Sequence, residues 1–189
     1  MTRSRPFQSS PRASRRPSPE RGWALRVACA ALGLLLPALA VAAAGWNTRP
    51  APDARATPWA VVKSDAGDEL ALFRDAEGKV RLRLSLHGTF AALAPRQCPT
   101  FQVDADKPPH QATLDRDCHV EAREALVDLG IIQNRALTSP AVDELMNGER
   151  IHVRFRRADG GYQETVFPLR RSSAAIRRAL GRDVRVRER

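Results

Sequence analysis

Alternating apolar and polar residues mark the clearest strand of the chain, at residues 80–86. This run reads VRLRLSL, so apolar residues occupy every second position, the period of a strand with one buried face. The run before it, residues 69–74, reads ELALFR, and residues 75–78 between them form the turn sequence DAEG. The pattern predicts a β-hairpin with one buried and one solvated face.

A second hairpin is predicted near the C-terminus. Residues 151–155 read IHVRF, and the sequence DGG at residues 159–161 reverses the chain. The returning run, residues 162–169, places Phe167 and Leu169 on one face. Both hairpins join neighbouring segments, which favours antiparallel pairing.

Four shorter apolar runs lie between the two hairpins, and we predict them as further strands. They cover residues 101–103, 110–114, 119–129 and 131–137. The stretch at residues 121–129 reads EAREALVDL, which is also compatible with a helix, so both structures stay open there.

Two short helices are predicted from their end signals. Ser139 is a suitable N-cap followed by proline, and Gly148 ends that helix. A second helix is capped by Ser172 or Ser173 and ends at Gly181. The apolar stripes of the two helices consist of Val142, Leu145 and Met146 in the first and Ile176, Ala179 and Leu180 in the second.

These elements predict a mainly β fold, an antiparallel β-sandwich or flattened barrel with two short helices. The β domain is expected at residues 59–181, which is long enough to bury a core. A proline-rich spacer is expected at residues 47–58, and a charged, frayed tail at residues 182–189.

The N-terminal segment predicts export or anchoring. Residues 1–26 are expected to form a disordered basic leader, and residues 27–46 contain an apolar run that ends in small residues. The sequence before Gly45 suits signal-peptidase cleavage after Ala44. The alternative is a retained membrane anchor, for which the apolar run is short and interrupted by Pro37. Arginine-rich flanks stay in the cytoplasm, so both alternatives place the β domain beyond the membrane.

Charge is concentrated at the two ends of the chain. Residues 1–26 contain seven arginines and one acid, and residues 170–189 contain eight arginines and two acids, whereas residues 45–169 are near neutral. This distribution and an aromatic content of only 5% argue against a nucleic-acid partner. The C-terminal arginines are interpreted as solvated cations near a helix end, with attraction to anionic lipid headgroups as an alternative.

Cys98 and Cys118 are predicted to form a disulfide. They are the two cysteines that remain after removal of a signal peptide containing Cys29, and an even number in an exported chain implies pairing. Their spacing relative to His110 and His119 matches no common zinc pattern.

Candidate catalytic and metal-binding chemistry is sparse. The chain lacks G-x-S-x-G, H-E-x-x-H and P-loop motifs. His152 is interpreted as a residue on the solvated face of a strand, and His87 as a loop residue. Asp104 and Asp106 resemble the start of a calcium loop, but the residues that follow supply no further ligands. We therefore expect no catalytic, metal or cofactor site.

The chain resembles the invasion-associated locus B family of exported bacterial proteins. The resemblance rests on a leading strand at Trp59, the cysteine region, residues 145–155 and the strand and helix at residues 167–180. The early cysteine pair often found in that family is missing. The resemblance implies a β-sandwich without known catalysis and transfers no site residues.

The expected function is that of an exported, non-enzymatic interaction module, periplasmic or secreted, with an envelope protein or surface as its partner. One alternative is an accessory subunit held in the inner membrane, with its β domain on the periplasmic side. The second alternative is an enzyme whose site is assembled from residues scattered along the sequence.

Overall fold

The computed structural model describes residues 45–52, 57–88 and 91–188. All of them belong to one compact unit, Val41–Arg189. The predicted leader and most of the predicted signal or anchor, including Ala44, lie outside the described residues. Among the helices that the structure does describe, none has the length and apolar character needed to cross a membrane.

The larger sheet is antiparallel and has six strands in the order β1-β2-β3-β4-β8-β7. Their bounds are Asn47–Arg49 for β1, Trp59–Lys63 for β2, Glu69–Arg74 for β3, Lys79–Ser85 for β4, Cys118–Val120 for β7 and Glu124–Ile131 for β8. The predicted first hairpin is β3–β4, in which Leu72 is the partner of Leu82. Its turn ends at Gly78, whose φ of +83° suits glycine best.

The smaller sheet has four antiparallel strands in the order β11-β10-β5-β6. Their bounds are Thr100–Val103 for β5, His110–Gln111 for β6, Arg150–Arg156 for β10 and Tyr162–Pro168 for β11. The predicted second hairpin is β10–β11, in which Ile151 is the partner of Phe167. Alternate residues of β10 are buried, as its sequence pattern predicts.

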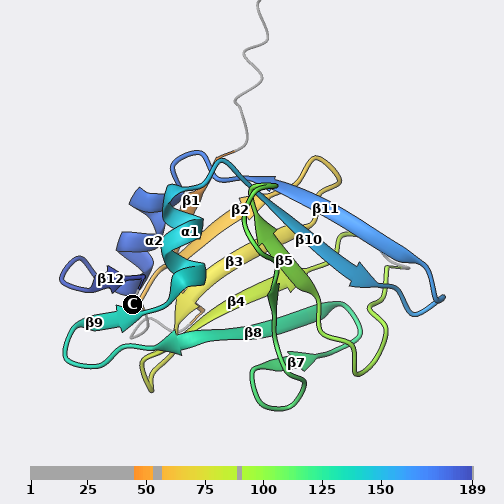
Figure 1. The fold of residues 1–189 in the computed structure, drawn as a ribbon, viewed down its shortest axis with the longest axis horizontal. Helices are drawn as coiled ribbons and strands as arrows, with labels where there is room; N and C mark the ends of the chain where they lie inside the picture. Colours follow the sequence, from red (N-terminus) through yellow and green to blue (C-terminus); the bar gives the residue numbers. More distant parts are fainter. Residues whose placement is uncertain (1–44, 53–56, 89–90, 189) are drawn as a thin grey trace, which may run out of the picture. The chain divides into compact units, whose positions relative to one another are not determined.

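The core lies between the two sheets and under the helices. Figure 1 shows β5, β10 and β11 in front of the larger sheet, with both helices to one side. Both inner faces contribute buried aliphatic and aromatic side chains, such as Leu70, Leu82, Val127, Val153 and Phe167. The described sheets do not close into a barrel, so the fold is mainly β and sandwich-like.

Helix α1, Pro140–Asn147, forms as its sequence predicts. The Ser139 hydroxyl accepts a hydrogen bond from the Val142 N–H at 3.3 Å, and the helix ends before Gly148. Helix α2, Ser172–Leu180, differs from the prediction at its start. Neither Ser172 nor Ser173 caps it. The N-cap is Arg171 at φ +66°, because the chain turns sharply after β11 and directs Ser172 into the core as the first helical residue.

Both predicted flanking segments contain strands. Residues 47–58, expected as a spacer, include β1, and the preceding Trp46 is 2% exposed in the core. Residues 182–189, expected as a frayed tail, include β12, Arg185–Arg187, which pairs in parallel with β9, Ala136–Thr138. Neighbouring buried residues explain the difference, since Trp46 just before β1 and Val184 just before β12 are both buried in the core.

Between the hairpins, β5 covers the predicted residues 101–103, whereas the other predicted strands are shorter or divided. The expected strand over residues 119–129 is two antiparallel strands, β7 and β8, joined by a tight turn. Residues 121–129 therefore form no helix. The run at residues 131–137 is broken by a turn in which Asn134 and Arg135 have φ of +49° and +59°. Only His110–Gln111 is strand in the run at residues 110–114.

Candidate functional site

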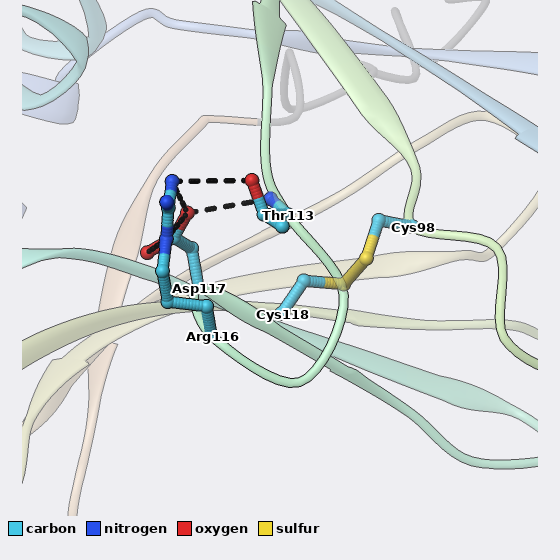
Figure 2. Close-up of a disulfide and its surroundings, with 5 residues drawn as sticks. All are labelled: Cys98, Thr113, Arg116, Asp117 and Cys118. Carbon is cyan, nitrogen blue, oxygen red and sulfur yellow. Dashed lines mark hydrogen bonds and ion pairs between the residues drawn. A yellow bond between two sulfur atoms is a disulfide. The ribbon is translucent and has the colours of Figure 1, made fainter.

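The predicted disulfide joins the two sheets. Cys98 precedes β5 of the smaller sheet, and Cys118 begins β7 at the edge of the larger one (Figure 2). Their Cα atoms lie 6.1 Å apart. Cys118 is buried in the core cluster and Cys98 packs against it, so the disulfide is part of the core at this edge.

A hydrogen-bonded turn holds Cys118 in position. The Arg116 guanidinium donates to both carboxylate oxygens of Asp117 and to the Thr113 hydroxyl (Figure 2). These bonds lower the pKa of Asp117 and raise that of Arg116. The Asp117 N–H also donates to the Thr113 carbonyl at 2.8 Å. This exposed network orders the chain leading into the disulfide.

A shallow hollow of about 480 Å³ opens beside the disulfide. We call it the cystine hollow. Its lining residues come from four separate segments, namely residues 96–100, residues 111–114, strand β10 and the first residue of β11. Cys98 itself forms part of the wall.

Arginine and tyrosine dominate the chemistry of the cystine hollow. Arg96, Arg154 and Arg156 line it, and its described lining contains no acidic residue. Tyr162 at its rim is 81% exposed, the most exposed of the large hydrophobic residues described. The Arg156 guanidinium carbon lies 5.7 Å from the centre of the Tyr162 ring, a cation–π arrangement. The hollow therefore combines positive charge with an accessible aromatic ring.

One carboxylate orients the second arginine of the hollow. Glu164 on β11 is ion-paired with Arg154, and its Oε1 lies 2.9 Å from Nδ1 of His152. Hydrogen bonding to His152, and then to Arg154, lowers the pKa of Glu164. The three side chains lie side by side on the outer face of the β10–β11 hairpin.

The other histidines are placed apart from one another. Nε2 of His110 lies 2.7 Å from Oε2 of Glu144, and its ring stacks on Phe101, so it connects β6 to α1. His119 is exposed on β7, and His87 follows β4. No group of three potential metal ligands from histidine, cysteine or acid residues occurs among the residues that the structure describes.

Asp104 and Asp106, the two candidate calcium ligands, lie in different surroundings. Oδ1 of Asp104 accepts hydrogen bonds from the N–H groups of Glu149 and Arg150, both at 3.0 Å. This carboxylate ties β5 to the start of β10. Asp106 lies exposed in the loop that follows. Of the predicted cleavage site, Gly45 is described and half-buried, while Ala44 lies outside the described residues.

Sequence reasoning does not find the cystine hollow. The alternation of β10 places Arg154 and Arg156 on its outer face, and the β10–β11 hairpin places Tyr162 opposite Arg156, but Arg96 meets them only through tertiary structure. The available signal is the surplus of arginines over acids at residues 154–157, next to the single tyrosine of the chain.

No protein-family model matches the chain, and no curated protein matches its sequence. Among solved structures, the fold is similar to the crystal structure of invasion associated protein B from Bartonella henselae. The TM-score is 0.49 at 14% sequence identity, and the match covers 71% of this chain and 91% of that protein. That protein is of the kind named in the resemblance stated from the sequence.

Proposed function

We propose that the chain is exported and that its β domain binds an acidic surface of another envelope protein through the cystine hollow. The observation that carries the proposal is the combination of three arginines and the 81% exposed Tyr162 in one hollow. Tyrosine and arginine are the residues most often found at the energetic centres of protein interfaces.

Charge and rigidity both support a protein partner. Arg154 is ion-paired with Glu164, but Arg96 and Arg156 form no ion pair with an acid among the described residues, so a carboxylate-rich partner would supply their counter-charge. Arginine also offers paired donors that match a carboxylate. The disulfide fixes one wall of the hollow, which lowers the entropy lost on binding.

The disulfide supports export. A cystine that links two sheets at the edge of the core forms and persists in oxidising compartments, whereas cytosolic proteins are kept reduced. An apolar segment preceded by an arginine-rich leader is the sequence feature that would deliver the chain there.

Photo-crosslinking in intact cells tests the proposal. A photoreactive phenylalanine analogue replaces Tyr162 in the full chain, and a matched analogue replaces Glu77, an exposed turn residue between β3 and β4. We expect one discrete protein crosslink from position 162 and none from position 77. The substitution Arg96→Glu, made at an exposed position, is expected to remove that crosslink by reversing one charge of the hollow.

Two results would contradict the proposal. The first is equal crosslinking from positions 162 and 77, which would indicate collision without a site. The second is a crosslink from position 162 that Arg96→Glu leaves unchanged, which would remove the role assigned to charge.

A further inference from the structure

A second hollow lies beside the C-terminal strand β12. It has a volume of about 680 Å³ and is bounded by α1, α2, the turn before β9 and strand β12. We call it the arginine hollow. Five arginines line it, namely Arg135, Arg177, Arg182, Arg185 and Arg187, together with the acids Asp143 and Asp183. Its lining therefore carries an excess of three positive charges.

The guanidinium groups of this hollow have no protein partners among the described residues. None of the five makes a side-chain hydrogen bond or ion pair with another residue in the part of the chain that the structure covers. The arginines on the outer face of the larger sheet differ, since Arg81 and Arg83 each contact two acids. All five arginines are exposed, so their guanidinium N–H groups are hydrated and remain available to an anionic ligand.

Main-chain bonds hold these like charges together. Strand β12 pairs in parallel with β9, which places Arg185 opposite Ala136, and the Arg185 N–H donates to the Arg135 carbonyl at 2.9 Å. The buried Val184 fixes the same segment against the core. The backbone therefore keeps the charges close despite their repulsion, and a hollow of one sign concentrates counter-ions.

We propose that the arginine hollow binds a ligand that carries two or more phosphate groups. A guanidinium presents parallel N–H donors that match two oxygens of a phosphate. Arginines from three separate segments line the hollow, so a ligand with two or more phosphates can contact more of them than a single phosphate can. The phosphates belong either to a free diphosphate compound or to lipid headgroups at a membrane surface.

Calorimetric titration of the full-length protein with inorganic pyrophosphate tests the site. We expect saturable binding with one pyrophosphate per chain. The double variant Arg177→Gln/Arg185→Gln is expected to weaken binding about tenfold or more, since charged hydrogen bonds are lost. The control Arg170→Gln/Arg178→Gln removes the same charge from exposed arginines outside the hollow and is expected to leave the Kd within about twofold.

Vesicles distinguish the two sources of phosphate. Flotation with phosphatidylcholine vesicles containing phosphatidic acid is compared with flotation on phosphatidylcholine alone, for both double variants. The site is assigned to lipid headgroups if the protein binds the acidic vesicles, if pyrophosphate releases it from them, and if only Arg177→Gln/Arg185→Gln weakens this vesicle binding. Pyrophosphate binding without a difference between the variants on vesicles assigns it to a free compound.

Two outcomes would overturn the inference. The first is no binding of pyrophosphate, whether or not a single-stranded oligonucleotide binds, and the second is equal loss of binding in both double variants. The inference does not depend on the cystine hollow, because the two hollows share no lining residue. Failure of the crosslinking experiment would leave it unaffected.

Discussion

The Cα atoms of Cys98 and Cys118 lie 6.1 Å apart although these residues belong to segments of different sheets. The disulfide is thus a covalent link across the sandwich, at the edge where β7 has a neighbour on one side only. It also forms part of the wall of the cystine hollow. Its formation therefore bears on stability, on the geometry of the proposed binding surface and on the compartment of the protein.

Removal of the disulfide is expected to destabilise the domain substantially. The variant Cys98→Ala/Cys118→Ala opens a loop with a sequence separation of 20, and its unfolding free energy should fall by about 3 kcal/mol. Chemical unfolding followed by tryptophan fluorescence measures the change. Reductant should shift the midpoint of the wild type and leave that of the variant unchanged. Equal unfolding free energies for the two proteins would show that the link contributes nothing.

Trp46 is expected to be essential to the fold although it lies next to the predicted cleavage site. Its ring is 2% exposed, and Trp46→Ala should cost roughly 3–5 kcal/mol through the cavity left in the core. Trp46→Phe keeps most of the apolar area and removes an indole N–H that has no partner among the described residues. Trp46→Phe should therefore lower the melting temperature much less than Trp46→Ala does. Similar melting temperatures for the two variants would contradict the buried position of Trp46.

Gly148 is expected to resist substitution for steric reasons alone. Its φ of −79° suits any residue, but an added Cβ would collide with Cγ1 of Val103 and lie 3.0 Å from Oδ2 of Asp104. Gly148→Ala should cost about 1–3 kcal/mol by overpacking. In the control Gly161→Ala, the Cβ would approach the Asp159 carboxylate at 3.3 Å, and this exposed side chain can move. Equal denaturant midpoints for Gly148→Ala and Gly161→Ala would contradict the close packing of Gly148 against Val103 and Asp104.

The cluster around Glu164 is expected to make stability depend on pH. Hydrogen bonding to His152, and then to Arg154, lowers the pKa of Glu164 in the folded protein. A lowered folded-state pKa stabilises the fold above the ordinary glutamate pKa, and that contribution is lost as pH falls through the lowered value. Glu164→Gln should therefore reduce the difference in melting temperature between pH 7 and acid pH. The effect is small because Glu164 is substantially exposed. An unchanged difference would refute the contribution of this carboxylate.

Local patterns predict much of the fold. The period of two in β4 and β10, the turns at Gly78 and Gly160, and the cap at Ser139 are all determined by neighbouring residues, and the structure contains each of them. The predicted cystine is present as well.

Long-range contacts explain what the patterns miss. Strand β1 has no apolar alternation, and it forms because Trp46 is buried and β2 supplies a pairing edge. Strand β12 needs β9, which lies some 50 residues earlier in the chain. The N-cap of α2 is Arg171 in the left-handed region, one residue before the first of the two serines predicted to cap it. The two hollows are likewise assembled from segments distant in sequence, so no single sequence motif predicts them.

Trapping of thiols in living cells tests export and oxidation together. Cells producing the full chain are quenched with acid, and their proteins are labelled with a maleimide of high mass either before or after reduction. The control is residues 45–189, produced without the leader and treated in the same way. We predict that Cys98 and Cys118 of the full chain react only after reduction, whereas both react at once in the leaderless form. Immediate reaction of both thiols in the full chain would contradict export to an oxidising compartment and with it the proposed envelope function.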